Sequence, residues 1–267
     1  MRLSFIGGGT MAEAILGGIL NASIAVAKDI CVGEVVKSRR EYLSSTYGIN
    51  TTDNNIKAID DAELIVLSIK PQDILSVSQV IKNKISNDQT VVSIIAGAAI
   101  NTLSGSTGHN KIIRIMPNTP AQIGSGMSVW TASDEVDAAH IELTKSILST
   151  IGEEIYVHDE KYLDMATGLS ASGPAYVFLI VEALIDAGVY VGLPRDMARK
   201  LALQTMYGST KLIMDTGRHP GELKDMVVSP GGTTAEGVQV LEKYSVPAAL
   251  VEAVNSAYLK SIRLGEK

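Results

Sequence analysis

The segment from Leu3 to Ile15 constrains this chain most, because it passes from an apolar run through consecutive glycines into a helical pattern. Gly7 allows a tight turn, Gly9 lets the backbone approach a phosphate, and Ala12 lets the helix pack on the strand, as in the G-x-G-x-x-A dinucleotide fingerprint. The helix N-terminus directs free N–H groups at the same place. We therefore predict a dinucleotide site rather than a merely flexible turn, with contacts at Ile6, Gly7, Gly8, Gly9, Thr10 and Met11.

Short β-branched runs alternate with helical segments up to about residue 158, which is typical of a doubly wound parallel α/β sheet. The predicted strands are Leu3 to Ile6, Ile30 to Val36, Leu64 to Ile69, Thr90 to Ile95, Lys111 to Ile115, Met127 to Thr131 and Glu154 to Val157. Beyond residue 160 helical patterns follow at Pro174 to Tyr190, Pro194 to Asp215, Thr234 to Tyr244 and Pro247 to Leu264. The sequence predicts a Rossmann domain over residues 1–158 and an all-helical domain over residues 159–267.

The helical pattern from Pro174 to Tyr190 is apolar nearly all round, with Glu182 and Asp186 as exceptions. A helix of this kind needs partners on several sides. We expect it to lie in a subunit interface, so the helical domain is also the predicted dimerisation domain.

Two opposite signals for the cofactor follow the second predicted strand. Glu34, at its end, can accept hydrogen bonds from ribose hydroxyls and disfavours a 2′-phosphate. Lys37, Arg39 and Arg40 come directly afterwards and could bind that phosphate instead. The residues alone therefore leave the choice between NADH and NADPH open. The alternative is that these charged residues form an ordinary solvated helix start and bind no cofactor.

The ends of the next two predicted strands also carry candidate cofactor contacts, because ligands bind at the carboxyl ends of strands in open α/β sheets. Ile69 and Lys70 close the third strand, where Lys70 could reach a ribose or a phosphate, unless it is an ordinary surface lysine. Ile95-Ala96-Gly97-Ala98-Ala99 ends the next strand with small residues, which suits close approach of a flat nicotinamide, unless it is a plain strand-to-helix turn.

The helical domain contains a second informative stretch, Ser229-Pro230-Gly231-Gly232-Thr233-Thr234-Ala235-Glu236. Thr233 and Glu236 have the spacing of a capping box, which predicts a helix start with Thr233 as N-cap. Consecutive N–H groups at a glycine-rich helix start form a nest for an anion. We expect the loop to bind a small carboxylate; a capped loop without a ligand is the alternative.

Composition and missing motifs narrow the chemistry. The net charge of −6 and the scattered Lys and Arg argue against nucleic acid and against an anionic membrane surface. No apolar stretch reaches the about 20 residues that span a bilayer, so we expect a cytoplasmic protein. The four histidines are scattered and Cys31 is the only cysteine, so we expect no metal site. Hydride transfer remains, because the cofactor carries the reactive atom.

Taken together, the motifs resemble the pyrroline-5-carboxylate reductase family over nearly the whole chain. The matching motifs are Phe5 to Ala12, Ile69 to Pro71, Ile95 to Gly97, Met116 to Pro120, Gly168 to Tyr176, His219 to Asp225 and, most specifically, Ser229 to Thr234. The resemblance implies reduction of 1-pyrroline-5-carboxylate to L-proline with NADPH or NADH, and homodimers that assemble further, typically to ten chains. No metal is implied.

The resemblance also assigns residues. It implies that Ser229 and the backbone around Gly232 and Thr233 hold the substrate carboxylate, with the Thr234 hydroxyl near the ring nitrogen as the catalytic group. It places Glu160 in the substrate site and Asn55, Lys70 and Ala96 at the cofactor. Two positions depart from the family pattern: Glu34 stands where NADPH users often have a small hydroxyl residue, and Met226 replaces an asparagine.

Two other functions compete with this interpretation. A 3-hydroxyacid dehydrogenase or a related imine reductase of similar two-domain build resembles the chain at the glycine turn but carries a catalytic lysine early in its second domain. No lysine occurs here between Lys161 and Lys200. A nucleotide-sensing regulatory protein would keep the Rossmann domain without turnover. It would not need the stretch from Ser229 to Thr234.

Overall fold

The computed structural model describes residues 1–265 and separates the chain into two compact units. The first contains Met1–Ser172 and residues 256–265, and the second contains Gly173–Asn255. The first unit thus extends beyond residue 158, where the sequence pattern changes. It includes α7 (Lys161–Ala166), whose Leu163 is fully buried, and the π-helical turn η4 (Thr167–Ala171).

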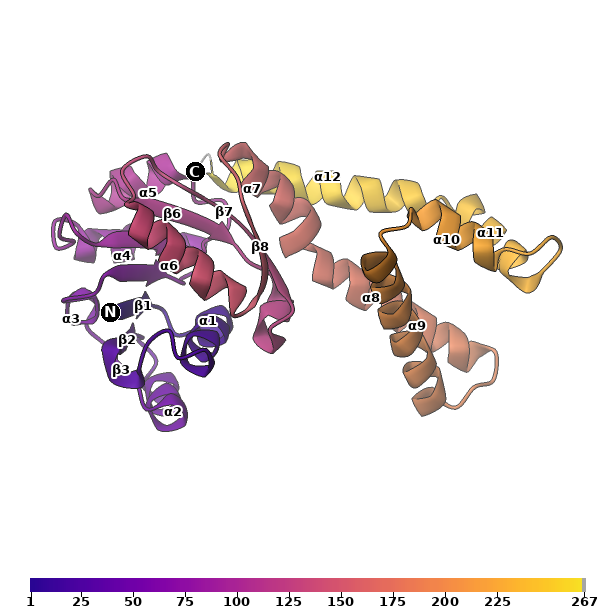
Figure 1. Cartoon of the computed structure of the whole chain (residues 1–267), viewed down its shortest axis with the longest axis horizontal. Helices are drawn as coiled ribbons and strands as arrows, with labels where there is room; N and C mark the ends of the chain where they lie inside the picture. The colour runs from indigo at the N-terminus through magenta and orange to yellow at the C-terminus, as the bar shows by residue number, and fades with distance from the viewer. Residues whose placement is uncertain (266–267) are drawn as a thin grey trace. The chain divides into compact units, whose positions relative to one another are not determined.

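A sheet of eight strands forms the centre of the first unit, in the order β3-β2-β1-β4-β5-β6-β7-β8 (Figure 1). The strands are β1 (Leu3–Ile6), β2 (Ile30–Gly33), β3 (Asn50–Thr52), β4 (Leu64–Leu67), β5 (Thr90–Ser93), β6 (Ile112–Met116), β7 (Gly126–Ala132) and β8 (Gly152–Tyr156). The order reverses between β1 and β4, and this is the switch point where open α/β sheets bind ligands. The predicted Rossmann fold is confirmed.

Helices cover both faces of this sheet (Figure 1). One core contains side chains from α1 (Thr10–Asn21), α2 (Lys37–Tyr47) and α6 (Ala138–Ser149); the other contains side chains from α3 (Asn55–Ile59), α4 (Ile74–Ile81) and α5 (Ile100–Thr107). Both faces are therefore buried, which explains why the central strands are continuous apolar runs. Short 3₁₀ turns occur at η1 (Ala27–Asp29), η2 (Pro71–Asp73) and η3 (Thr119–Ile123).

Two features of the sheet differ from the sequence prediction. β7 pairs antiparallel with β6, and β8 is parallel to β7, so the sheet is not wholly parallel. The link between β6 and β7 is nine residues long, from 117 to 125, and contains the 3₁₀ turn η3. A parallel crossover needs about a dozen residues or more. β3 was not predicted, because this edge strand, Asn50-Thr51-Thr52, is polar.

The second unit contains α8 (Gly173–Tyr190), α9 (Arg195–Thr216), α10 (Pro220–Val227), α11 (Thr233–Lys243) and the first half of α12 (Val246–Gly265). The four predicted helices of this region are all present, whereas α10 was not predicted. α8 packs against α9, where Gly188 leaves room for Ala198: a Cβ on Gly188 would lie 2.8 Å from the Ala198 Cβ. Tyr176 donates to the Ala253 carbonyl at 3.5 Å, which joins α8 to α12.

Candidate active site

The glycine turn between β1 and α1 has the geometry that a phosphate-binding loop requires. Gly7 has φ +96°, and a Cβ there would lie 2.6 Å from the Ser68 carbonyl oxygen. Gly9 is the N-cap of α1, so no side chain caps the first N–H groups of this helix. A Cβ on Gly9 would meet no atom within 4 Å. The turn therefore leaves open space directly before the first N–H groups of α1, which is the arrangement that an anion-binding helix N-terminus requires.

A cleft of about 820 Å³ opens at this turn, at the carboxyl ends of β1, β2 and β4. It brings together residues that are far apart in the sequence, as the dinucleotide hypothesis requires. The predicted cofactor residues that line it are Ile6, Gly7, Gly9, Thr10, Met11, Glu34, Asn55, Ile69 and Lys70. Gly8 and Ala96 are not among the lining residues.

Glu34 lies in the cleft, but its carboxylate also holds the backbone. Oε2 accepts from the Gly8 N–H at 2.9 Å, and Oε1 accepts from the Val36 N–H at 2.8 Å. A carboxylate has lone pairs for further donors, so Glu34 can still accept from a ribose hydroxyl.

The cations that follow Glu34 are turned to protein partners. Arg40 donates to the carbonyls of Glu34 and Val35, at 2.6 and 3.0 Å, and lies 3.6 Å from Asp53. Lys37 is exposed and lies 3.7 Å from Glu41. Arg39 binds Glu13 and the Gly8 carbonyl. None of these three cations lines the cleft.

Lys70 is the cation that does line the cleft. It is exposed and forms no ion pair within the described residues. Beside it, Ser68 donates to the Gly7 carbonyl at 2.6 Å. Ser68 therefore fixes the glycine turn, a role that its sequence context did not reveal.

Ala96 lies in a separate, smaller cavity of about 340 Å³, together with Gly97 and Leu264. Gly97 has φ +74°, and a Cβ there would lie 2.7 Å from the Leu264 Cβ. The end of α12 thus covers the loop after β5. The structure places Ala96 beside this helix, outside the cleft that contains the glycine turn.

Glu160 is held by a buried arginine that the sequence analysis did not single out. Arg114, on β6, is 1% exposed and donates to Glu160 Oε1 at 2.8 Å and to Asp164 Oδ1 at 3.0 Å. The Ile100 N–H also donates to Glu160 Oε1, at 2.8 Å. The Ser261 hydroxyl donates to Asp164 at 2.7 Å and so ties α12 to the same group. A charged residue inside the buried strand Ile112–Met116 was the available signal.

The predicted carboxylate loop lies in the second unit. Gly231 has φ +64°, and the Gly232 N–H donates to the Ser229 carbonyl at 3.0 Å, so the chain turns tightly into α11. The N-cap of α11 is Gly232, with no side-chain cap bond, so the predicted N-cap role of Thr233 is wrong. Thr233 is the first helical residue. The half-buried Thr234 follows it, and its hydroxyl makes no hydrogen bond within residues 1–265.

The predicted interface helix is exposed in the single chain. α8 has no buried residue, and Phe178, Leu179 and Tyr190 are exposed on it. The helical stretch from Lys161 to Tyr190, which comprises α7, η4 and α8, is long and apolar enough to cross a membrane by length and composition alone. The expectation that no stretch reaches that length is therefore wrong.

Within the described residues, no group of three or more His, Cys, Asp or Glu side chains is placed to hold a metal ion.

Two family profiles match the two parts of the chain. One, described as NADP oxidoreductase coenzyme F420-dependent, matches residues 2–97. The other, described as pyrroline-5-carboxylate reductase dimerisation, matches residues 160–264. The second range includes all of α8, so dimerisation through the helical domain accounts for its exposed apolar side chains.

Full-length relatives agree with these profiles. The chain is 43% identical to the pyrroline-5-carboxylate reductase of Synechocystis sp. over 267 residues, which is 100% of this chain and 99% of that protein. It is 38% identical to the Escherichia coli pyrroline-5-carboxylate reductase, over 99% of this chain and 98% of that protein. The crystal structure of Plasmodium falciparum pyrroline carboxylate reductase with NADP bound has a TM-score of 0.91 and 34% identity, covering 99% of this chain and 98% of that one. The resemblance drawn from the motifs is confirmed: the chain belongs to the pyrroline-5-carboxylate reductase family of NAD(P)-dependent oxidoreductases.

Proposed function

We propose that this chain reduces the C=N bond of 1-pyrroline-5-carboxylate to give L-proline, the last step of proline biosynthesis. The observation that carries the proposal is the conjunction of a phosphate-binding glycine turn at the switch point of the sheet with full-length similarity to reductases of that name. A regulatory protein would need only the glycine turn. The similarity to the reductases, however, extends over the full chain and so includes the Ser229 to Thr234 loop.

In this reaction the bound nicotinamide supplies the hydride. The glycine turn and the first N–H groups of α1 hold the pyrophosphate, and Lys70 supplies a positive charge beside it. We propose that Ser229 and the N–H groups at Gly232 and Thr233 hold the substrate carboxylate. The Thr234 hydroxyl, which has no protein partner among the described residues, is then free to bind at the ring nitrogen.

The family resemblance also assigns Glu160 to substrate binding, and we propose that it contacts the substrate. Both of its hydrogen bonds converge on Oε1, which leaves Oε2 for a ligand. A protonated imine is a strong hydride acceptor, so the chain's residues mainly bind and orient the substrate. Holding two reactants in the reacting geometry contributes much of the rate enhancement.

We expect the purified protein to oxidise NADH or NADPH only when 1-pyrroline-5-carboxylate is present. The decrease in reduced-cofactor absorbance and the appearance of proline measure this turnover. A chelator should leave the rate unchanged, because the proposed roles use no metal. Loss of activity with the chelator and recovery with a divalent ion would contradict the mechanism, and absence of proline would contradict the function.

We further expect NADH to be used at least as well as NADPH. Glu34 lines the cleft, while Arg39, Arg40 and Lys37 are paired with protein groups and do not. A 2′-phosphate at this position would therefore meet a carboxylate. The ratio of kcat/KM for the two cofactors tests the expectation; a preference for NADPH above about tenfold, or roughly 1.4 kcal/mol, contradicts it.

The helical domain makes the homodimer, and we propose that dimers assemble further, to a ring such as a decamer. The exposed apolar surface of α8 supports the first association. Assembly beyond the dimer rests on the family resemblance. A cytoplasmic location stays a proposal. Independence from nucleic acid and from membranes stays a prediction from the charge distribution.

A further inference from the structure

Arg39 lies in the first turn of α2, in the segment where a 2′-phosphate would be bound. Its side chain, however, points toward the glycine turn between β1 and α1. Its Nε donates to the Gly8 carbonyl at 2.5 Å, and its Nη2 is ion-paired with Glu13 Oε2 on α1. The two side chains are only 27% and 20% exposed. The guanidinium thus has its partners on Gly8 and Glu13, away from the cofactor cleft, which neither Arg39 nor Glu13 lines. We call this the protein side of the glycine turn.

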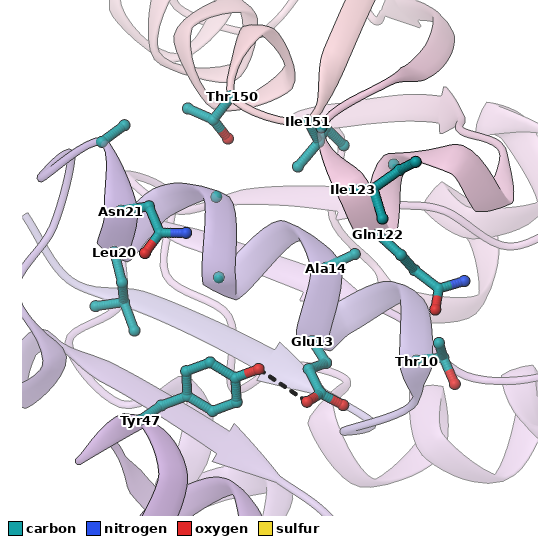
Figure 2. A pocket seen from close by; sticks show the side chains of 15 residues that line it. Thr10, Glu13, Ala14, Leu20, Asn21, Tyr47, Gln122, Ile123, Thr150 and Ile151 are labelled. Atoms are coloured by element: carbon teal, nitrogen blue, oxygen red, sulfur yellow. Dashed lines mark hydrogen bonds between the residues drawn. The ribbon is translucent and has the colours of Figure 1, made fainter. Parts of the chain in front are cut away.

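Glu13 is itself held in a fixed position and in its charged form. It lines a cavity of about 750 Å³ behind α1, and Figure 2 shows its contact with Tyr47. Its Oε1 accepts from the hydroxyls of Tyr47 and Tyr42, at 2.8 and 2.9 Å. Burial raises the pKa of Glu13, but the hydrogen bonds from Arg39, Tyr47 and Tyr42 together outweigh burial and leave this pKa below its ordinary value. Burial and the bond to Glu13 raise the pKa of Tyr47 to about 12, so Tyr47 remains a donor.

The backbone of Gly8 is therefore held at its N–H and at its carbonyl by two side chains that follow β2 in the sequence. Glu34 accepts from its N–H at 2.9 Å, and Arg39 donates to its carbonyl. Arg39 leaves this arrangement only if its ion pair with Glu13 breaks. A phosphate on the ribose would have to compete with Glu13 for the guanidinium, because Arg–phosphate and Arg–carboxylate pairs use the same N–H groups.

We propose that Glu13 determines cofactor specificity, by holding Arg39 on the protein side of the glycine turn and so lowering affinity for NADP relative to NAD. The proposal rests on the proposed function only for the identity of the cofactors. Glu13 does not line the cleft. It is a positioning residue that acts through Arg39, and removing its charge frees the guanidinium for a 2′-phosphate.

Calorimetric dissociation constants for NADP⁺ and NAD⁺, measured on the full-length protein without substrate, test this directly. In Glu13→Gln we expect the affinity for NADP⁺ to rise relative to NAD⁺ by about three- to fivefold, the range of a part-exposed ion pair. The matched control is Glu142→Gln, an exposed glutamate on α6, which makes the same change of net charge away from Arg39. Its ratio should equal that of the wild type.

Arg39→Met distinguishes a role through Arg39 from a general effect of charge. Added to Glu13→Gln, it should abolish the gain in NADP⁺ affinity. Alone, it should leave the ratio unchanged, because Arg39 is already paired; this variant also tests the proposal if Glu13→Gln does not fold. An unchanged ratio in Glu13→Gln, a gain that persists without Arg39, or a selective loss of NADP⁺ binding in Arg39→Met alone would each overturn the proposal.

These binding measurements remain informative if the proposed reaction is absent. A protein that binds both dinucleotides with the expected ratios but makes no proline would contradict the proposed function and support the role of Glu13. Proline formation with an unchanged ratio would do the reverse.

Discussion

Replacing Arg114 with methionine is expected to lower the free energy of unfolding by about 3 kcal/mol or more, because the change leaves two carboxylates without their cation. Arg114 is 1% exposed and bridges Glu160 to Asp164, and Asp164 in turn binds Ser261 on α12. The expected loss is at the lower end of the usual range, since the Glu160 and Asp164 side chains keep 31% and 21% exposure. Denaturant unfolding at fixed protein concentration measures it, because the protein dimerises.

Arg2→Met is the matched control for this prediction. Arg2 pairs with Asp61 at 2.7 Å, but the two side chains are 57% and 72% exposed, so its loss should cost about 1 kcal/mol or less. Adding Glu160→Gln and Asp164→Asn to Arg114→Met should recover part of the stability, since no uncompensated charge then remains. Equal losses in Arg114→Met and Arg2→Met would show that the buried group does not stabilise the fold.

The sequence predicted those elements that are determined by residues close together in the chain. Gly7 and Gly9 identified the glycine turn because each supplies a backbone property that a turn into a helix requires, and Ala12 because its small side chain lets the helix pack on the strand. The apolar runs identified the central strands because both faces of the sheet are buried. The polar edge strand Asn50–Thr52 has no such run, and the direction of β7 depends on a short connection and not on composition.

The candidate site was harder to predict where it depends on side chains that meet across the fold. Arg39 was a candidate phosphate ligand by position, but its direction depends on Glu13, 26 residues earlier in the sequence. Arg114 meets Glu160 across 46 residues. Thr233 had the spacing of a capping box, yet the N-cap of α11 is Gly232, one residue before the predicted position. Gly231, with φ +64°, turns the chain directly before this N-cap.

We expect Thr234→Ala to lower kcat/KM for 1-pyrroline-5-carboxylate by roughly 10- to 150-fold, which corresponds to about 1.5 to 3 kcal/mol for a hydrogen bond to a charged group. The Thr234 hydroxyl has no protein partner within the described residues, so its loss removes no internal hydrogen bond. The fold should therefore be retained. Thr234 does not line the cofactor cleft, so dissociation constants for NADH should stay close to those of the wild type.

Two further variants decide whether the hydroxyl acts on the substrate. Thr234→Ser keeps the hydroxyl and should retain most of the activity, whereas Thr210→Ala removes a hydroxyl that only bonds the Met206 carbonyl on α9 and should change kcat/KM little. Wild-type kcat/KM in Thr234→Ala, or a loss of cofactor affinity in proportion to the loss of activity, would remove this loop from the substrate site. A selective loss that serine restores would place the Thr234 hydroxyl at the reacting nitrogen, because a helix N-terminus that only held the carboxylate would use backbone N–H groups, which alanine also has.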